Sequence, residues 1–562
     1  MNIDITWISW GLAFLPLALL LLLMLGAGWG AAEAGPLSWM FALAIAFFYF
    51  DAPLEVIGYE NAKGIWSALT VLYVVWASIL IYEVSHEGQA FEPLRRGITR
   101  LLPDPLMQVM AFGWAFASFL QGVTGFGVPI AVCAPLLVGI GVRPLYAVTI
   151  PLIGHAWNNT FGTLAVAWLG LKEVTGMDAA VAAQTALYAA SFIWVLNLFG
   201  GLLVCWLYDR WNGIRAGLPM VIVMSMIQGG LTLVLSQWND TLNGFVASSV
   251  AFVAIFALGR MKRYRDTKPA TSRIFTEARR QTDPDGQGPD APAPAGAADV
   301  VAKDGETNGS VSPSENGKRA AGGMSLQAAF IPYFALLFVT FSVLLIPPVK
   351  DALGSWSFGL SFPETVTQLG FVQPARVANF APLTHAGTFL LVAALVGYLA
   401  YVRLGTVRNG GFRRIVGRTV DKAIPSTIAV VALIAMSNVM AGSGSVSVLA
   451  QGVAAATSQG YGFLAPMVGG LGSFMTTSNL ASNLLFGTFQ QTTAEVTGLY
   501  GPAILGAQTA GAAAGNMIAP GNVLLGTTTA GILGREGEVL KITIPLFALV
   551  ALIIGACVLF VA

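Results

Sequence analysis

The chain has 562 residues, of which 56% are hydrophobic and only 10% are charged. A water-soluble protein could not bury this much apolar surface, so the composition excludes the soluble classes and predicts an all-α polytopic membrane protein. The net charge of +1 says nothing about nucleic-acid or acidic partners, because in a membrane protein the position of each charge matters more than the sum.

Twelve runs of about twenty apolar residues are long enough to be transmembrane helices. They are residues 8–30, 37–50, 64–84, 145–170, 183–208, 217–236, 241–259, 326–347, 383–402, 421–441, 499–531 and 541–561. Two further apolar segments, 105–142 and 445–492, are rich in Gly, Pro, Ser, Thr and Asn. The arginine-rich loops all fall on one side of the membrane if each of these two segments returns to the side from which it entered. We therefore predict two re-entrant hairpins, the first entering from the cytoplasm and the second from outside.

A segment with almost no large apolar side chains, residues 281–322, divides the chain. Such a composition cannot form a core, so we predict a disordered cytoplasmic linker over 261–324. It separates an N-terminal repeat, 1–260, from a C-terminal repeat, 325–562. The three cysteines lie far apart in apolar runs, and we expect neither a disulfide framework nor a metal site.

The two glycine- and polar-rich segments share a pattern that indicates an inverted repeat. "ASFLQGVTGFGVPIA" from Ala117 and "GSFMTTSNLASNLLF" from Gly472 both open small-Ser-Phe-apolar, and each is followed by a second interrupted stretch, "PLIGHAWNNTFGTL" or "AGAAAGNMIAPGNVLL". Inverted repeats with broken helices are typical of secondary transporters that bind substrate near the membrane midplane. Irregular backbone at that depth must be buried in protein or line a cavity.

Polar side chains within these interruptions are the candidate substrate ligands. A half-helix N-terminus presents free N–H groups to an anion, and glycine lets the ligand approach the backbone. The main ionisable group at membrane depth is His155, which is either neutral and hydrogen-bonded or part of a proton or ligand path. Asn and Ser clusters have an alternative role, holding helices together. The candidates are Gln121, Thr124, Gly125, Gly127, His155, Asn158, Asn159, Thr477, Ser478, Asn479, Asn483 and Asn516.

At "FLQGVTGFGVPIAVCAPLLVGIGVRPLYAV", "TTSNLASNLLFGTFQQTTA" and "GNMIAPGNVLLGTTTAGILGREGEVLK" the chain resembles the L-lactate permease family, which includes glycolate permeases. That family is similar in organisation to the ion-transporter superfamily. The resemblance implies a cation-coupled symporter, driven by H⁺ or Na⁺ with no other cofactor. It would import a small 2-hydroxymonocarboxylate such as L-lactate or glycolate across the plasma membrane, the bacterial inner membrane, and would form a homodimer.

Two positions depart from the family pattern. The family usually has a glutamate where this chain has Gln121 and an aspartate where it has Asn479. Both replacements remove a carboxylate that would carry a co-transported proton. Three alternatives follow: His155 takes the proton, sodium is held by Asn, Ser and backbone oxygens, or the substrate is a related anion such as a sulfonate or sulfocarboxylate.

Other classes of function fit the sequence less well. A passive anion channel or facilitator needs a continuous pore but no coupling site. An enzyme is not expected, because the chain has no His-Glu-x-x-His motif and no Gly-x-Ser-x-Gly motif on a recognisable nucleophile elbow.

Overall fold

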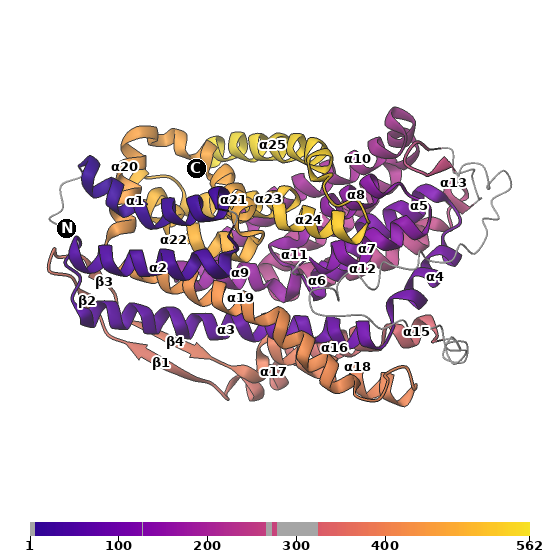
Figure 1. The fold of residues 1–562 in the computed structure, drawn as a ribbon, viewed down its shortest axis with the longest axis horizontal. Helices are drawn as coiled ribbons and strands as arrows, with labels where there is room; N and C mark the ends of the chain where they lie inside the picture. Colours follow the sequence, from indigo (N-terminus) through magenta and orange to yellow (C-terminus); the bar gives the residue numbers. More distant parts are fainter. Residues whose placement is uncertain (1–5, 28, 126, 266–271, 278–323) are drawn as a thin grey trace, which may run out of the picture.

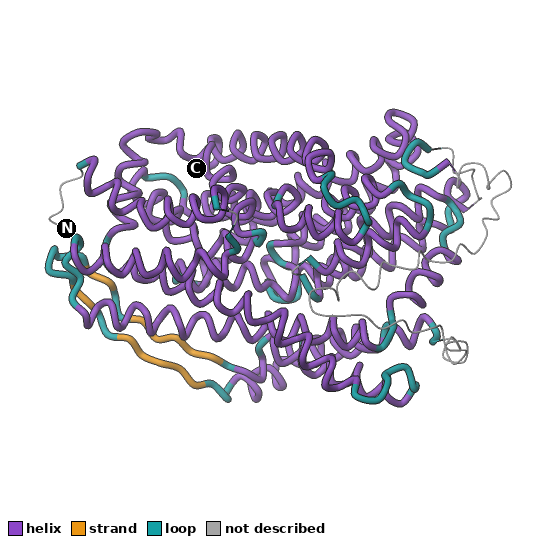
Figure 2. Tube along the Cα trace, viewed as in Figure 1, coloured by secondary structure: helices purple, strands orange, loops and turns teal. Residues whose placement is uncertain are grey.

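The structure is a computed structural model that describes the chain except for residues 1–5, 28, 126, 266–271 and 278–323. The described part is almost entirely helical (Figures 1 and 2), which confirms the predicted all-α membrane class. The first half contains α1 (Trp7–Leu21), η1 (Leu22–Gly26), α2 (Ala31–Phe48), α3 (Leu54–Glu87), α4 (Phe91–Leu101), α5 (Pro105–Met110), η2 (Ala111–Phe116), α6 (Ala117–Val123), α7 (Val128–Gly139), α8 (Pro144–Ala156), η3 (Trp157–Asn159), α9 (Gly162–Thr175), α10 (Ala179–Ser225), η4 (Met226–Gly230), α11 (Leu231–Trp238), α12 (Asn243–Gly259) and α13 (Lys262–Arg265).

The second half begins after the predicted linker. It contains α15 (Leu326–Ala329), α16 (Ile331–Leu344), α17 (Pro347–Gly354), β1 (Phe358–Phe362), β2 (Thr365–Val366), β3 (Val372–Gln373), β4 (Arg376–Phe380), η7 (Pro382–Thr384), α18 (Ala386–Arg403), α19 (Gly411–Gly442), α20 (Ser445–Thr457), η8 (Ser458–Gly460), α21 (Tyr461–Thr476), α22 (Asn479–Thr497), α23 (Gly501–Gly515), η9 (Asn516–Ile518), α24 (Pro520–Thr529) and α25 (Glu536–Val561).

The described residues include eight helices long and apolar enough to cross a membrane, or nine if the bent pair α16–α17 counts as one span. Helices occupy all twelve predicted runs, but several are broken, short or joined. The helical segment from Ala179 to Trp238, for example, joins two predicted runs, and its backbone leaves the helical region between them at Asp209 and Arg210. The chain is thus a multi-pass membrane protein, and the number twelve stays a prediction.

The two longest unkinked helices, α3 and α19, pack antiparallel along most of their length. A Cβ added at Gly64 of α3 would lie 2.7 Å from the Cα of Ala435, so the two backbones almost touch there. At the opposite end of the pair, Glu83 contacts Arg418. Small residues that let helix backbones approach are a common basis for helix association in membranes.

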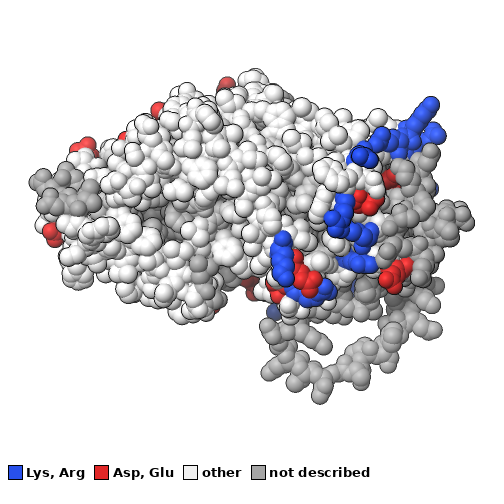
Figure 3. Space-filling view, turned by 90° about the horizontal axis from the view of Figure 1, so that it is seen from above, with Lys and Arg blue, Asp and Glu red and all other residues white. Residues whose placement is uncertain are grey.

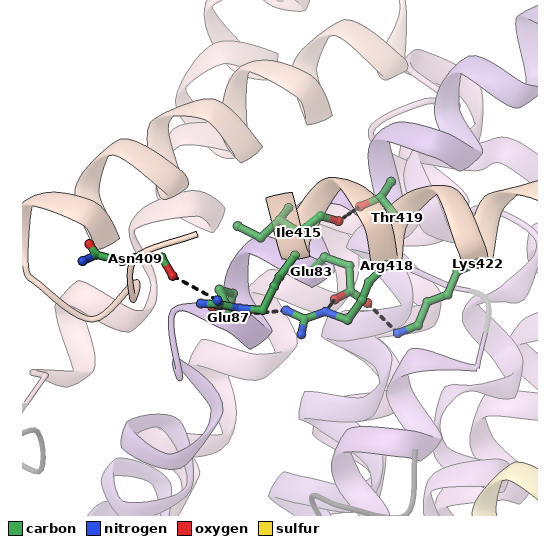
Figure 4. Close-up of polar contacts among 8 residues, drawn as sticks. Glu83, Glu87, Asn409, Ile415, Arg418, Thr419 and Lys422 are labelled. Atoms are coloured by element: carbon green, nitrogen blue, oxygen red, sulfur yellow. Dashed lines mark hydrogen bonds and ion pairs between the residues drawn. The ribbon is translucent and has the colours of Figure 1, made fainter. Parts of the chain in front are cut away.

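An ion-pair cluster joins these helices at one end (Figure 4). Glu83 is fully buried and accepts hydrogen bonds from Arg418 Nε at 2.8 Å and Lys422 Nζ at 2.5 Å. Glu87 accepts from Arg414 and Arg418, both at 2.5 Å. Because an unpaired buried carboxylate would be very costly, these pairs fix the relative position of α3 and α19.

The start of α3 differs from the prediction. The apolar run begins at residue 64, whereas the helix begins at Leu54 and includes Glu60 and Lys63. These two side chains pair at 2.7 Å and are only 1% and 3% exposed. Prediction from hydropathy ends a membrane helix where charged residues begin. It therefore misses a helical turn in which two opposite charges form a buried ion pair.

Each half contains one helical hairpin. In the first, α5, η2 and α6 lead to a turn, and α7 packs back against η2, within the predicted 105–142. In the second, α21 and α22 pack together, but the hairpin begins at Tyr461 because residues 445–457 form the separate helix α20. The re-entrant character and opposite entry sides stay predictions.

Glycines bring each hairpin into close contact with the broken helix that follows it. A Cβ at Gly154 of α8 would lie 1.9 Å from the carbonyl oxygen of Gly113. In the second half, a Cβ at Gly511 of α23 would lie 2.0 Å from the carbonyl oxygen of Pro466. Any larger residue would separate the two elements, so part of the glycine enrichment serves packing.

The strands were not predicted. β1 pairs antiparallel with β4, with Phe358 opposite Phe380, and β2 pairs with β3. Figure 2 shows them along one edge of the molecule, beside α3, and Trp66 of α3 donates a hydrogen bond to the Ala378 carbonyl at 3.0 Å.

Basic residues gather toward one end of the face in Figure 3, which leaves the rest of that face nearly free of charge. This distribution agrees with basic loops on the cytoplasmic side.

The predicted disordered linker, 261–324, needs a correction. Most of it lies outside the described residues, but Ile274 and Phe275 are buried. The Arg143 amide donates to the Ile274 carbonyl at 2.7 Å, and Phe275 forms a β-bridge with Val142. Two apolar side chains in the sequence "SRIF" are enough to attach this short stretch to the loop between α7 and α8.

Candidate functional site

A small polar cavity of about 50 Å³ lies where the turns of the two hairpins meet the breaks in the two interrupted helices. Residues from both halves of the chain line the cavity, and seven of them are predicted site residues. The lining residues are Gln121, Gly127, Asn159, Thr163, Val166, Ala167, Thr477, Ser478, Asn479, Leu480 and Asn516.

Three helices begin at this cavity. α7 starts directly after Gly127, α22 starts directly after Ser478, and α24 starts just after the turn that contains Asn516. Ser478 caps α22 by accepting a hydrogen bond from the amide of Ala481. The N-terminal end of a helix carries partial positive charge from the helix dipole, so these three helix starts together favour an anion.

Left-handed backbone occurs on both sides of the cavity. Thr163, Leu164 and Ala165, in the break of the first interrupted helix, have φ values of 52°, 50° and 64°. Thr477, in the turn of the second hairpin, has a φ of 58°. Each such non-glycine residue costs about 1–2 kcal/mol relative to ordinary helical backbone. Strain of this kind clusters at ligand sites, which supports a functional role for the cavity.

Two glycines make the first hairpin turn possible. Gly125 and Gly127 have φ values of 61° and 78°, which favour glycine. A Cβ at Gly125 would lie 2.2 Å from Thr163 Oγ1, and one at Gly127 would lie 2.6 Å from Leu525 Cδ2. The turn therefore packs directly against both broken helices.

Asn479 joins the two halves at the back of the cavity. Its amide nitrogen donates to Thr160 Oγ1 at 3.2 Å and to the Thr509 carbonyl at 3.3 Å. Thr160 in turn donates to the same carbonyl at 3.2 Å. The Oδ1 atom of Asn479 has no hydrogen-bond partner among the described residues, although the side chain is only 3% exposed. An unpartnered buried oxygen at a cavity wall is available to a ligand.

Asn516 occupies the break of the second interrupted helix and contacts three different elements. Its side-chain oxygen lies 3.2 Å from His155 Nε2 and accepts a hydrogen bond from Asn522 at 2.8 Å. Its amide nitrogen points to the Thr477 carbonyl at 3.5 Å. Asn516 therefore links His155, which lies behind the cavity, to the hairpin turn at its wall.

Five predicted residues do not line the cavity: Thr124, Gly125, His155, Asn158 and Asn483. The Thr124 hydroxyl donates to Leu120 of its own helix at 2.8 Å. Asn158 and Asn483 hold neighbouring elements together. Asn158 donates to the carbonyl oxygens of Ser118 at 2.9 Å and Gly244 at 3.1 Å.

The sequence interpretation missed Thr163, Val166, Ala167 and Leu480. Thr163 lies three residues after the Asn-Asn-Thr cluster, so its position beside the predicted break was a usable signal. The other three are apolar and ordinary in a membrane helix. No pattern in the sequence separates an apolar side chain at a cavity from one in the core.

The described residues of the cavity wall are all uncharged. Among the described lining residues there is no Asp, Glu, Lys or Arg, and no group of three or more potential metal ligands was found in the described part of the chain. Any anion held here must be stabilised by amides, hydroxyls and helix N-termini. The wall also offers oxygens to a cation, at Asn479 and at the ends of the helices that stop at the cavity.

The far end of α9 is anchored by an ion pair. Asp240 accepts hydrogen bonds from Trp168 Nε1 and Lys172 Nζ, both at 2.6 Å. Burial alone would raise the pKa of the Asp240 carboxyl, but the Lys172 charge and the two hydrogen bonds outweigh it and hold that pKa below its ordinary value. This contact fixes the broken helix relative to the loop before α12.

Comparisons with known proteins agree over nearly the whole chain. The family model described as L-lactate permease matches residues 9–562. An L-lactate permease of Salmonella typhimurium is 26% identical over 96% of this chain and 93% of its own length. The glycolate permease GlcA of Escherichia coli is 26% identical over 93% of this chain and 90% of its own.

Among solved structures, the YdaH transporter of Alcanivorax borkumensis aligns with 89% of this chain and 86% of its own. The identity is 12% and the TM-score 0.39, which is too low to support an argument about the fold.

Proposed function

Because the chain belongs to the L-lactate permease family, we propose that it is a secondary active transporter that imports a small 2-hydroxymonocarboxylate such as L-lactate or glycolate. Import across the plasma membrane is driven by a cation gradient, of H⁺ or Na⁺. The chain moves its substrate chemically unchanged and is not an enzyme.

The cavity between the two hairpin turns is the observation that carries this proposal. Its wall is polar but has no charged side chain among the described residues, and three helices begin at it. This environment suits one carboxylate, whose charge is stabilised by helix N-termini and by the amides of Gln121 and Asn159. The free Oδ1 of Asn479 would accept a hydrogen bond from the 2-hydroxyl group of the substrate.

Cation coupling is supported by the same geometry. A cation bound together with a monocarboxylate makes the transported pair electrically neutral, and this avoids the cost of moving a net charge, about 2.3 kcal/mol per 100 mV. The C-terminal ends of helices α6, α21 and α23 bring backbone carbonyl oxygens to the cavity. Their partial negative charge is opposite in sign to the partial positive charge at the helix starts.

A related organic anion, such as a sulfonate or sulfocarboxylate, is the second candidate substrate. The observation in its favour is that Gln121 and Asn479 are both neutral and both line the cavity. Such a wall does not repel an additional acidic group as carboxylates would. The small volume of the cavity favours the smaller monocarboxylates.

Uptake of radiolabelled L-lactate into proteoliposomes, with H⁺ and Na⁺ gradients imposed separately, tests the proposal. We expect accumulation against the lactate gradient, competition by glycolate, and weak competition by a disulfonate. Equilibration without accumulation would indicate a facilitator instead. If lactate does not enter while a sulfocarboxylate does, the second candidate replaces the first.

The variant Asn159→Ala provides a site test with a matched control. Asn159 donates to the carbonyl of Ala156 on its own helix, and Asn438 of α19 makes the same kind of local bond to Ile434. Only Asn159 lines the cavity. We expect at least a tenfold loss of uptake in Asn159→Ala and parental uptake in Asn438→Ala.

We also propose a homodimer, on the basis of the family's organisation. Mass measurement of the purified protein in detergent, corrected for bound detergent, should give twice the chain mass, and a single-chain mass would reject it.

A further inference from the structure

His155 lies at the end of α8, only 1% exposed, with an oxygen atom close to each ring nitrogen. Its Nδ1 is 2.6 Å from the backbone carbonyl oxygen of Pro151, and its Nε2 is 3.2 Å from Oδ1 of Asn516. A backbone carbonyl oxygen can only accept a hydrogen bond, so Nδ1 must carry a hydrogen.

The orientation of the Asn516 amide is determined by Asn522. The side-chain nitrogen of Asn522 lies 3.1 Å from the backbone carbonyl of Asn516, and only the amide nitrogen can donate there. The same nitrogen lies 2.8 Å from the Asn516 side chain, so the atom that it meets must be the oxygen. That oxygen is also the atom that faces Nε2 of His155, so this 3.2 Å contact is a hydrogen bond only when Nε2 carries a hydrogen as well.

Hydrogens on both ring nitrogens make the ring an imidazolium. We propose that His155 binds the proton that is transported with the substrate, and that Asn516 couples this proton to the cavity. The inference rests on the proposed function and names the residue that would carry H⁺. The arrangement of heavy atoms around His155 is the one that a protonated ring favours.

Loss of the proton would disturb Asn516. The Nε2 lone pair would then face Oδ1 of Asn516, and two acceptors at this distance repel each other. Asn516 must rotate or move to relieve the contact, which also changes its approach to the Thr477 carbonyl in the hairpin turn. The protonation of His155 is therefore connected to the geometry of the cavity wall.

Burial opposes a lone imidazolium at this depth. His155 faces Pro151 on its own helix and Asn516 of η9, and no charged side chain among the described residues acts on it. A substrate carboxylate in the adjoining cavity would supply the missing negative charge. Proton and substrate then stabilise each other, and linkage requires that each raises the affinity for the other by the same factor.

The test is equilibrium binding of labelled L-lactate to the full chain in lipid nanodiscs, over roughly pH 6–8.5, a range that brackets the ordinary histidine pKa of about 6.5. We expect the affinity of the parent to fall by up to about tenfold per pH unit as the proton becomes scarce. His155→Gln should bind with an affinity independent of pH.

His385→Gln is the matched control, because burial lowers the pKa of His385 to about 4, outside the tested range. This variant should keep the parental pH dependence. Parental binding that does not change with pH, or a pH dependence that survives in His155→Gln, would overturn the inference while leaving the proposed function intact.

A second measurement reads the protonation of the ring directly, with saturating L-lactate bound. The chain has only three histidines, so ¹⁵N-histidine solid-state NMR in bilayers resolves His155 as the signal lost in His155→Gln. We expect two protonated ring nitrogens at about pH 6. If His155 has one protonated nitrogen there, the inference fails; if lactate does not bind the parent at all, the proposed function fails instead.

Discussion

The neighbouring residues Asn158 and Asn159 should separate folding from transport. Asn158 is fully buried, and its amide nitrogen joins the carbonyl oxygens of Ser118 and Gly244, on two different helices. Alanine leaves both carbonyls buried and unpaired. At about 1–3 kcal/mol for each, with partial relaxation, we expect Asn158→Ala to lower the free energy of unfolding by about 2–4 kcal/mol. The Oδ1 atom of Asn158 has no hydrogen-bond partner among the described residues, so its removal adds nothing to this loss.

Asn159→Ala should behave in the opposite way. Its amide makes one local hydrogen bond, to Ala156 at 3.0 Å, and the side chain lines the cavity. We expect a loss of about 1 kcal/mol or less in stability, together with the loss of uptake. The assay is thermal unfolding in detergent and lactate uptake in proteoliposomes, measured on the same preparations. If Asn158→Ala unfolds like the parent but does not transport, Asn158 belongs to the site and this reasoning is refuted.

Three further predictions concern the cavity and its supports. Gly127→Leu should abolish uptake, because the added Cβ would lie 2.6 Å from Leu525 Cδ2 and the backbone there has a φ of 78°. Gly58→Leu is the control and should transport normally, because nothing lies within 4 Å of a Cβ added there. Equal uptake by the two variants would contradict the turn geometry. Ala165→Gly should raise the free energy of unfolding by about 1 kcal/mol by relieving a φ of 64°, and a lower thermal midpoint than the parent would show that this strain is absent. Asp240 has a pKa below its ordinary value of about 3.9, so the stability that it contributes is fully present above that value and is lost as the pH falls toward the lower folded-state pKa. Lys172→Met should therefore lower the free energy of unfolding at neutral pH and reduce the further loss of stability below about pH 4, as thermal unfolding at several pH values would show. If the stability of the variant depends on acid pH as that of the parent does, the ion pair does not contribute as described.

The sequence predicted the parts of the fold that depend on local composition. Long apolar runs require membrane helices, and clusters of Gly, Pro and Asn within such runs mark breaks. For this reason the first hairpin and both interrupted helices could be located, and seven of the predicted site residues lie together at one cavity.

Features that depend on distant partners could not be predicted. The early start of α3 relies on the Glu60–Lys63 pair, and the buried Glu83 on basic residues of α19 more than three hundred positions away. Similarly, Asn158 and Asn159 are identical in type and adjacent in sequence. Asn158 supports the fold because α6 and α12 pack against it, and Asn159 faces the site because it lies at the cavity.

The left-handed backbone at Thr163 could not be predicted from the sequence either. Only Gly162 in "TFGTLA" readily permits a positive φ, and yet the three residues after it adopt one. The surrounding structure imposes this conformation, through contacts such as the hydrogen bond from the Thr163 hydroxyl to the Gln121 carbonyl at 3.3 Å.

Direct observation of the bound substrate would test the central claim, that the cavity between the two hairpin turns holds the transported anion. The measurement is a cryo-electron microscopy structure of the full chain in nanodiscs with saturating L-lactate. We predict density for one molecule in contact with Asn159, Asn479 and the start of α7. Density elsewhere in the protein, with this cavity still closed and empty, would contradict the account.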